Sequence, residues 1–523
     1  MPNKNILLIE PDYKNKYPPL GLMKIAQYHG PRGTRDNVRF IKGRDQSVES
    51  TAWDRIYVTT LFSFEYARIA ETIDYALRLV RGQGSRVFVG GIAASLMHSR
   101  FLGEPRWSGV RFIKGLLDKA PGPSLELDQF SGELYADDLT GTPIELLIPD
   151  YSILDQIEHK YPVSDAYFTY ASRGCIRKCH FCGVPKLEGG LRDNESISVI
   201  VKSIAELYGE KKDLILMDNN VVASSRYKEI IAEIRDLGFT PGAKLYRNGR
   251  PLTRRVDFNQ GVDARILSKD PSYLREMSTI AIKPLRIAFD HLGLKKPYEA
   301  SIRYAHQFGL HELSNYMLYN FHDSPLDLYE RMVLNVELNV ELGVRIWSFP
   351  MRYQPTDLPH RSFVGEHWTR YELRALQIVL QATHGVVSGE PDFFRRAFGA
   401  DAAEFHDLLM RPQHYIFNRE WFENGPGRAE YEAFRSQYKT LSQSQRDELR
   451  ELVSTVDPRL FKTLVSATTD GQLRRILPYY ILPAKSAEAK IWRASKLLPR
   501  AKPMPTMPAD EIVEDAGLEE DVA

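Results

Sequence analysis

The chain has only three cysteines in 523 residues, and all three fall in one short stretch. Cys175, Cys179 and Cys182 have the spacing C-x3-C-x2-C. Thiolates are soft ligands for iron and zinc, and three of them on one loop can bind three irons of a [4Fe–4S] cube. Full cysteine ligation of such a cluster needs four thiolates, so the fourth iron would stay open to a substrate or cofactor. The motif therefore predicts a fold that presents one short cluster-binding loop.

Other metal or thiol sites are alternatives. A zinc site could use the three cysteines and one histidine. His180 is the nearest candidate, but it directly follows Cys179, and adjacent residues rarely ligate one zinc ion tetrahedrally. A redox-active thiol cluster is the other alternative. The spacing favours the iron–sulfur cluster over both.

The cysteine motif, with an aromatic residue (Phe181) just before the last cysteine, resembles that of the radical S-adenosylmethionine (SAM) superfamily. The resemblance implies that the open iron chelates the amino and carboxylate groups of SAM. It also implies that an electron from the cluster cleaves SAM to a 5′-deoxyadenosyl radical, which abstracts hydrogen from a substrate. The implied cofactors are a [4Fe–4S] cluster and SAM. The implied partner is an electron donor such as flavodoxin or ferredoxin.

The composition is that of an ordinary globular chain of two to four domains, with 43% apolar and 26% charged residues. A formal net charge of +1 provides no global field that would attract nucleic acid or an anionic membrane. No apolar run is long enough to span a bilayer, and none at the start resembles a signal peptide. Clustered thiols without further cysteines argue against disulfides. We therefore expect a cytoplasmic protein with no membrane partner.

Strand-like and helix-like segments alternate over residues 1–125, which predicts an α/β fold with a Rossmann-like, doubly wound parallel sheet. Turn residues after two of the strands resemble those of the cobalamin-binding domain that precedes many radical SAM cores. The candidate cobalamin contacts are Pro19, Gly21, Thr60, Gly90 and Gly91. The Asp-x-His-x-x-Gly motif that supplies a histidine to cobalt is absent. A tight turn in the scaffold is the alternative role for the glycine pair, and cobalamin binding is left open.

Residues 119–165 have no regular periodicity and contain Pro121, Gly122, Pro123, Gly132, Gly141 and Pro143, and residues 126–165 are therefore predicted to be a linker. About six strand–helix units follow over residues 166–355, which predicts a partial (β/α)6, TIM-like radical SAM barrel. Polar residues gather at the carboxyl ends of its strands, where barrel enzymes place their sites. By resemblance, the candidate SAM contacts are Phe181, Asp218, Asn219, Asn220, Gln260, Asp263, Arg265 and Asn320. Helix caps and buried polar pairs are the alternative roles.

Residues 356–500 have helical periodicity and predict a helical C-terminal region, and residues 501–523 predict a disordered acidic tail. The expected function is a radical SAM enzyme, with cobalamin-dependent methyl transfer to an unactivated carbon as one reaction. A radical SAM oxidoreductase or rearrangement enzyme without cobalamin is the alternative. A non-catalytic binding protein with a metal loop, acting on RNA, is more remote. No cysteine remains for a second cluster, which argues against thiolation. The substrate and the catalytic residues are not predicted.

Overall fold

The computed structural model describes residues 3–118, 143–194, 196–387, 389–455, 460–482 and 491. The chain forms two compact units. The first contains Met1–Ala288, Pro297–Leu313 and Gln354–Phe363. The second contains Phe289–Lys296, Ser314–Tyr353 and Val364–Ala523. Segments of the two units alternate along the sequence, and the division therefore does not follow the predicted domain boundaries, which remain predictions. Residues 126–142 of the expected linker (126–165) and the whole expected acidic tail (501–523) lie outside the described residues.

A five-stranded sheet in the order β2-β1-β3-β4-β5 begins the first unit. Its strands are β1 (Asn5–Glu10), β2 (Asn37–Lys42), β3 (Arg55–Thr60), β4 (Val87–Gly91) and β5 (Arg111–Phe112). All neighbours are parallel, which confirms the parallel sheet expected here. The run from Ile6 to Ile9 is fully buried because helices cover both faces of the sheet. The order is that of flavodoxin-like folds, in which ligands bind beside the ends of β1 and β3.

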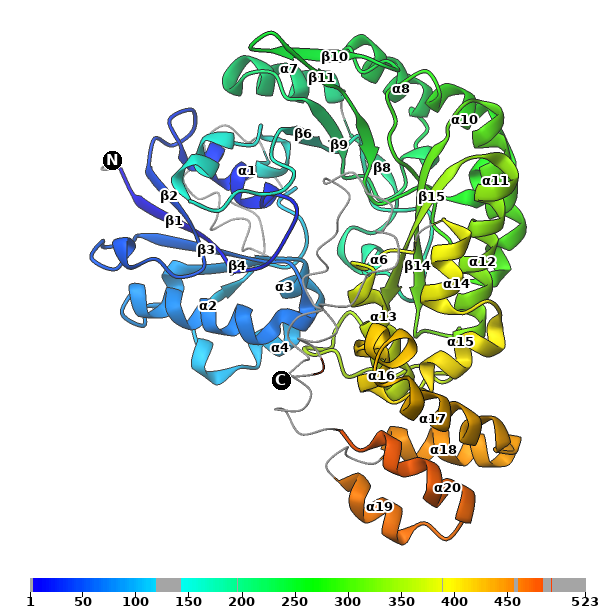
Figure 1. Cartoon of the computed structure of the whole chain (residues 1–523). Coiled ribbons are helices and arrows are strands. Elements are labelled where there is room, and N and C mark those ends of the chain that lie inside the picture. The colour runs from blue at the N-terminus through cyan, green and yellow to red at the C-terminus, as the bar shows by residue number, and fades with distance from the viewer. Residues whose placement is uncertain are drawn as a thin grey trace. The chain divides into compact units, whose positions relative to one another are not determined.

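The helices around this sheet follow the strands in turn. Figure 1 shows α1 (Leu20–His29) and α2 (Tyr66–Leu79) on opposite faces of the sheet. Two short helices, α3 (Ile92–Leu96) and α4 (His98–Leu102), follow β4. The hydroxyl group of Thr60 accepts a hydrogen bond from the amide of Ala94 at 2.9 Å, which fixes α3 at the carboxyl edge of the sheet.

A second parallel sheet in the same unit has the order β12-β9-β6. Its strands are β6 (Ala166–Thr169), β9 (Asp213–Leu216) and β12 (Val256–Phe258), and bridges continue it toward β13 (Leu285–Arg286). The helices of this region are α6 (Val184–Leu187), α7 (Ile197–Tyr208), α8 (Tyr227–Asp236), α9 (Ala264–Leu267), α10 (Ser272–Met277) and α11 (Lys295–Gln307). The parallel strand–helix units are as expected, and their closure into a partial barrel remains a prediction.

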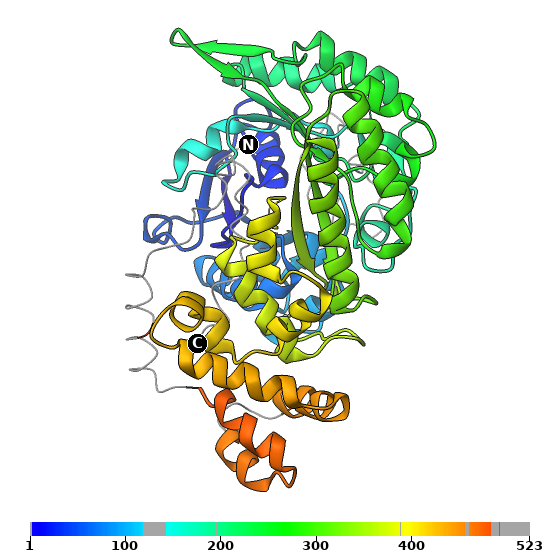
Figure 2. The same ribbon diagram turned by 45° about the vertical axis from the view of Figure 1, so that its right-hand side comes forward.

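Two antiparallel pairs interrupt this pattern. β7 (Ser172–Arg173) pairs with β8 (Arg192–Asp193) and closes the base of the cysteine loop. β10 (Lys244–Arg247) pairs with β11 (Arg250–Thr253) in a hairpin that Figure 2 shows projecting beyond the neighbouring helices. Asn248 and Gly249 both have positive φ at its turn, as a two-residue hairpin requires.

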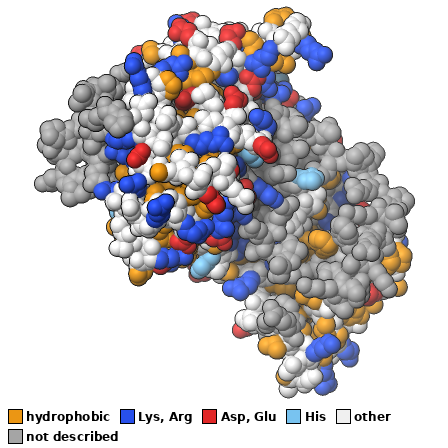
Figure 3. All heavy atoms as spheres, turned by 90° about the vertical axis from the view of Figure 1, so that its left-hand side faces the viewer, with side chains coloured by type: hydrophobic (Ala, Val, Ile, Leu, Met, Phe, Trp, Pro, Cys, Tyr) orange, Lys and Arg blue, Asp and Glu red, His pale blue; other side chains and the backbone are white. Residues whose placement is uncertain are grey.

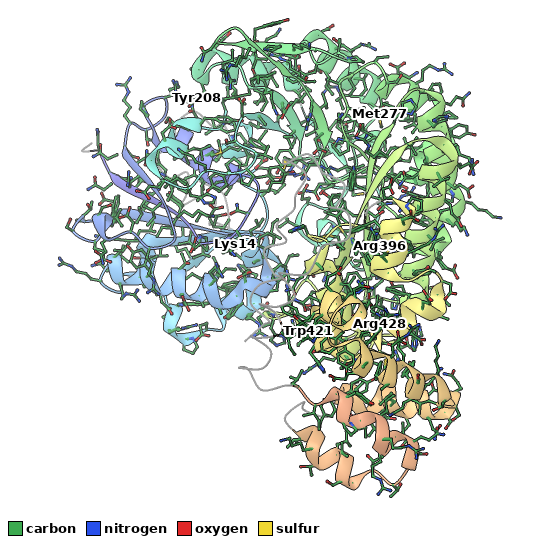
Figure 4. All side chains as sticks on the ribbon, in the orientation of Figure 1. Lys14, Tyr208, Met277, Arg396, Trp421 and Arg428 are labelled. Carbon is green, nitrogen blue, oxygen red and sulfur yellow. The ribbon has the colours of Figure 1, made fainter. Side chains whose placement is uncertain are left out.

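Several loops tie the two sheets of the first unit together. Tyr208, labelled in Figure 4 at the end of α7, donates a hydrogen bond to Asp150 at 2.9 Å and accepts one from Arg32 at 3.1 Å. Tyr17 follows β1 and donates a hydrogen bond to Asn259 beyond β12 at 2.6 Å. On the described part of the face shown in Figure 3, positive and negative side chains are interspersed, in keeping with the near-zero net charge.

The second unit combines two neighbouring strands with many helices. The strands are β14 (Glu312–Tyr319) and β15 (Arg345–Arg352), with α12 (Pro325–Leu342) between them in sequence. The later helices are α13 (Arg370–Ala382), α14 (Pro391–Phe398), α15 (Ala402–Leu409), α16 (Gln413–Phe417), α17 (Arg428–Thr440), α18 (Gln443–Thr455), α19 (Phe461–Ala467) and α20 (Gly471–Ile476). This confirms the helical C-terminal region. No helix in the described part of the chain is both long and apolar enough to cross a membrane.

Arg331 on α12 is a fully buried arginine of the second unit. Its side chain is fully buried and donates to the carboxylate of Asp323 at 2.7 Å and to the carbonyl oxygens of Phe289, Asp290 and Leu318 at 2.8–3.1 Å. A charge can be buried at tolerable cost when a partner charge and hydrogen bonds replace its hydration. Arg331 therefore joins the segments that flank β14 within this unit.

Candidate cofactor site

The cysteine loop leaves the carboxyl end of β6 through β7 and returns through β8. Gly174 begins the loop with φ +75°, and a Cβ there would lie 2.2 Å from the carbonyl oxygen of Gly190. Only glycine fits this close approach of two backbones. The amide of Cys175 then donates to Gly189 at 3.3 Å, and that of Cys182 donates to Cys179 at 3.1 Å. The three cysteines are thus held in one closed loop.

Each sulfur has a nearby hydrogen-bond donor. The amide of Arg177 lies 3.3 Å from Sγ of Cys175, and the amide of Val184 lies 3.4 Å from Sγ of Cys182. The pKa of Arg265 is raised by its hydrogen bond to Asp263 and further by a hydrogen bond to Cys179 and its charge. Such donors stabilise thiolates and tune the potential of clusters that thiolates bind.

The cysteine loop offers a set of donors that suits a cluster better than a single metal ion. Within the described residues, no three His, Cys, Asp or Glu side chains are grouped as one metal ion requires. In a [4Fe–4S] cluster each thiolate binds a different iron, so three half-buried cysteines with N–H donors on their sulfurs fit that group chemically. His180, which a zinc site would need, has an exposed side chain.

Asp218, just beyond β9, forms hydrogen bonds with the backbone segment that leads into the cysteine loop. Its carboxylate accepts hydrogen bonds from the amides of Ala171 at 2.9 Å and Ser172 at 2.5 Å, and from the Ser172 hydroxyl at 2.7 Å. Burial raises its pKa to about 6, although these hydrogen bonds act in the opposite direction. The side chain is 2% exposed, so its oxygens serve the protein's own backbone. Asp218 is therefore best described as a residue that positions the loop.

Glu188, at the end of α6, is a functional candidate that the sequence reasoning missed. Its carboxylate accepts from the amide of Gly174 at 2.8 Å and from the side chain of Asn219 at 2.9 Å. It also lies 3.5 Å from the guanidinium of Arg173. Glu188 thus ties the start of the cysteine loop to the end of β9. A single glutamate in a short turn carries no local sequence signal for contacts with residues so distant in sequence.

A row of side chains with alternating charge extends from the contact between Glu188 and Arg173 to α1. Arg173 lies 3.9 Å from Glu145, and Glu145 lies 3.1 Å from Lys24 on α1. The Arg173 guanidinium also stacks 3.9 Å from the ring centroid of Tyr170. Burial lowers the pKa of Lys24, and Glu145 partly opposes this effect. Lys24 on α1 and Glu145 therefore contribute to the surroundings of the loop within the first unit.

Asp263 and Arg265 lie against the cysteine loop, as a shared site requires. Asp263 accepts from the side chains of Arg177 at 2.7 Å and Arg265 at 2.8 Å, and it caps α9 through the Arg265 amide. Burial alone would raise the pKa of Asp263, but the hydrogen bonds from the two arginines outweigh it and lower the pKa. The structure therefore brings these two candidates together with Cys179.

The other candidates beyond β9 and β12 have different surroundings. Asn219 is half-buried and bound to Glu188. Asn220 is 3% exposed, and its Oδ1 has no hydrogen-bond partner among the described residues. Phe181 is half-buried in the turn between the last two cysteines, whereas Gln260 is exposed. Only Asn220 thus has a buried acceptor for a ligand to satisfy.

Asn320 belongs to the second unit and has a local role there. Its backbone is left-handed, with φ +67°, and its side chain is fully buried. The amide group donates to the carbonyl of Tyr353 at 3.1 Å, and its oxygen accepts from the backbone of Gly365 at 2.7 Å. These bonds join two strand-end segments of that unit.

The predicted cobalamin contacts lie at the carboxyl edge of the five-stranded sheet, and most of them make contacts within that sheet. The Thr60 hydroxyl donates to the carbonyl of Gly90 at 2.9 Å. Gly91 has φ +108°, and a Cβ there would lie 2.4 Å from the carbonyl oxygen of Thr60, whereas a Cβ on Gly90 would make ordinary contacts. Pro19 precedes α1, and Gly21 is exposed with open space around it. Only Gly21 shows the open surface that a bulky ligand needs.

This edge of the sheet adjoins the cysteine loop in the first unit. A Cβ on Gly183 would lie 3.1 Å from the side chain of Leu96 at the end of α3. The segment Gln354–Phe363 touches both regions. Thr356 accepts a hydrogen bond from Lys186 at 3.2 Å, and the guanidinium of Arg361 lies 4.0 Å from the ring centroid of Phe64 beyond β3. The two expected ligand regions are therefore neighbours.

No protein-family model matches the chain, and no curated protein sequence matches it. Among solved structures, it is similar to selenomethionine-labelled apo OxsB, a cobalamin-dependent S-adenosylmethionine radical enzyme. The two chains are 12% identical, the match covers 95% of this chain and 80% of the other, and the TM-score is 0.46. A likeness this weak assigns neither a fold nor an activity.

Proposed function

We propose that the chain is a radical SAM enzyme whose [4Fe–4S] cluster is held by Cys175, Cys179 and Cys182. The observation that carries the proposal is the cysteine loop itself. The three cysteines of the chain share one loop at the carboxyl end of a parallel strand, and each sulfur has an N–H donor. With SAM bound, such a cluster supplies one electron that breaks a carbon–sulfur bond of SAM to give methionine and a 5′-deoxyadenosyl radical.

The residues around the loop have distinct roles in this proposal. Asp218 and Glu188 fix the backbone that leads into Cys175, so the thiolates are preorganised. Arg265 places a positive charge beside Cys179, which favours the thiolate. Asn220 offers a buried acceptor, and leaving such a group unpaired costs about 1–3 kcal/mol. The amino group of SAM is a donor that would satisfy it.

Anaerobic reconstitution tests the proposal. We expect a brown protein with about four irons and four sulfides per chain. Reduction with dithionite in the presence of SAM is expected to give 5′-deoxyadenosine. Each of Cys175→Ala, Cys179→Ala and Cys182→Ala removes one of the three thiolates and is expected to abolish both results. A single variant that kept full iron and cleaved SAM would contradict the assignment, as would a colourless wild-type protein with one zinc.

The role of Asn220 is tested separately from the cluster. We expect Asn220→Ala to bind SAM at least tenfold more weakly while its iron content and absorption spectrum match those of the wild type. Gln260→Ala is the matched control, because Gln260 is also a predicted strand-end amide but is exposed. Unchanged SAM affinity in Asn220→Ala would remove Asn220 from the site.

Cobalamin-dependent methyl transfer is the second candidate, favoured by the flavodoxin-like sheet and its open edge at Gly21. Gly91→Leu would clash with the strand beside it and is unsuitable as a test. Gly21→Leu adds bulk into open space at the start of α1 and leaves the fold intact. If cobalamin lies there, this variant is expected to lose cobalamin and keep the cluster. If the wild-type protein binds no cobalamin, cobalamin-dependent methyl transfer is refuted, and the proposed function is then SAM radical chemistry without cobalamin.

A further inference from the structure

The β10–β11 hairpin carries a local excess of positive charge. No Asp or Glu occurs between Thr240 and Arg255, whereas this stretch contains the cationic residues Lys244, Arg247, Arg250, Arg254 and Arg255. The whole chain has a net charge of only +1, so the excess belongs to this element and does not reflect the composition. The hairpin also projects beyond the helices beside it (Figure 2). Cations gathered on a projecting element produce a local field that attracts polyanions.

Two arginines face each other at the tip of the hairpin. Arg247 and Arg250 are paired directly across the two strands, where like charges destabilise a sheet. Asp165 neutralises Arg247, with nitrogen-to-oxygen distances of 2.8 and 3.1 Å. Within the described residues, the exposed side chains of Arg250 and Lys244 make no hydrogen bond or ion pair. An anion from outside the chain would supply the counter-charge that they lack.

Tyr246 presents an aromatic ring beside these cations and is 70% exposed. Side chains alternate between the two faces of a strand, so Tyr246 lies on the same face as Lys244, about 7 Å away along β10. Its partner across the hairpin is Pro251. The buried Leu245 lies on the other face and anchors the hairpin. An exposed ring next to a cation suits one nucleotide, because the base stacks on the ring while the ammonium group binds the adjoining phosphate.

Other partners fit this hairpin less well. An extended peptide would have to add a strand to its edge, but Pro251 removes one N–H from β11, and the two strands are short and cationic. A second copy of the chain would bring the same positive charge. A lipid surface requires a broad apolar face. Tyr246 is the one large apolar side chain exposed in the hairpin, all of whose residues the structure describes.

From these observations, we propose that the β10–β11 hairpin binds a single-stranded nucleic acid. Tyr246 stacks on one base, Lys244 pairs with the adjoining phosphate, and Arg250 pairs with a phosphate at the tip of the hairpin. The ring needs a base that is free to unstack from its neighbours, which selects a single strand over a duplex. None of these contacts reads the edge of a base, so the binding has little sequence preference.

This inference is independent of the proposed function. The hairpin precedes the amino end of β12, whereas the cysteine loop follows the carboxyl end of β6. Since β6 and β12 run parallel in one sheet, the hairpin and the loop lie at opposite ends of it. Binding at the hairpin therefore requires neither a cluster nor SAM.

Fluorescence anisotropy with the full chain tests the inference. The probe is a fluorescein-labelled oligouridylate of about 12 nucleotides, a usual site size for a single strand. At about 50 mM salt we expect a dissociation constant of about 1–100 μM, the range of binding without sequence preference. Lys244→Glu should bind the probe at least about fivefold more weakly. It should also lower the slope of log Kd against log salt concentration by about 0.7, the value for one lost phosphate contact.

Two substitutions of Tyr246 separate stacking from general apolar contact. Tyr246→Leu keeps an apolar side chain but loses the ring, and we expect binding to weaken about tenfold, as for one lost stacked base. Tyr246→Phe keeps the ring and should bind within about twofold of the wild type. Both side chains are tolerated on an exposed strand, and equal thermal midpoints of the two variants would verify that the hairpin stays folded.

Lys228→Glu is the matched control for the change of charge. Lys228 is an exposed residue in the first turn of α8. The hairpin follows the other end of this helix, and Lys228 lies about 12 Å along its axis from Asp236, the last helical residue. The control alters the net charge by the same amount as Lys244→Glu and should leave the affinity within about twofold of the wild type.

The inference is overturned if the wild-type chain does not bind the oligouridylate at about 100 μM. It is also overturned if Tyr246→Leu binds as tightly as the wild type, or if Tyr246→Phe loses as much affinity as Tyr246→Leu. Equal weakening by Lys228→Glu and Lys244→Glu would show that the charge of the hairpin has no special role. Binding to phosphatidylserine vesicles without binding of the oligouridylate would assign the hairpin to a lipid surface instead.

Discussion

Replacing Asp218 by alanine is expected to loosen the segment that leads into Cys175. The carboxylate accepts two backbone hydrogen bonds, from Ala171 at 2.9 Å and Ser172 at 2.5 Å, in a site where it is 2% exposed. A buried donor that loses its acceptor costs about 1–3 kcal/mol. Two such amides predict a local loss of about 2–6 kcal/mol, before the serine hydroxyl is counted.

Hydrogen–deuterium exchange of the peptide that contains Ala171 and Ser172 measures this loss. A local destabilisation of about 3 kcal/mol corresponds to roughly 100-fold faster exchange of the two amides. The reconstituted variant should also release iron to a chelator faster than the wild type. Asp236→Ala is the control, because Asp236 is exposed at the end of α8. Unchanged protection of both amides in Asp218→Ala would refute the assigned role of the carboxylate.

The carboxylate of Asp218 should also make the local stability of this segment depend on pH. Its pKa of about 6 in the folded protein lies above the ordinary value of 3.8. Between these values the folded state binds more protons than the unfolded state, so local stability falls as pH rises from about 4 to about 6. The full effect is ~3 kcal/mol. Asp218→Asn cannot titrate and should lose this slope in exchange-protection factors, and an equal slope in both proteins would contradict the reasoning.

Three further predictions concern Gly91, Arg331 and Glu188. Gly91→Ala should lower the thermal midpoint because its Cβ meets the backbone of β3, whereas Gly21→Ala, in open space on a helix, should not lower it. Arg331→Met leaves the carboxylate of Asp323 buried without its partner, so urea unfolding of the second unit should show a loss of about 3–5 kcal/mol. Glu188→Gln keeps one oxygen acceptor but loses the charge beside the loop, and its reconstituted cluster should lose iron several-fold faster to a chelator than the wild type.

The regular part of the fold was accessible from sequence because local patterns determine it. The apolar run from Ile6 to Ile9 can be buried only in a strand that is covered on both faces, and the structure buries all four residues. The helical periodicity after residue 356 is likewise confirmed by α13 to α20. The β10–β11 hairpin was missed, although Asn248-Gly249 is a strong turn signal between its strands.

The surroundings of the cysteine loop were less accessible because they depend on contacts between distant residues. Asp218 was predicted as a SAM contact, which stays a prediction, and its hydrogen bond with the backbone of Ser172, 46 residues earlier in the chain, has no local sequence signal. Glu188 contacts Asn219, 31 residues away, and nothing in the local sequence marks that pair. Arg265, by contrast, was a candidate and lies at Cys179. Strand-end position alone therefore identifies the region of the site and not the partner of each side chain.

The division of the chain into two units has a consequence for how the protein can be dissected. Each unit is assembled from several segments, and short segments such as Phe289–Lys296 and Gln354–Phe363 belong to a unit other than that of their neighbours in sequence. Neither unit can therefore be expressed as a contiguous fragment, and a single cut in the chain releases neither of them. A gene fusion that exchanged one unit for that of another protein would need several crossover points. The chain should accordingly be inherited and engineered as a whole, with variation introduced in loops and surface residues.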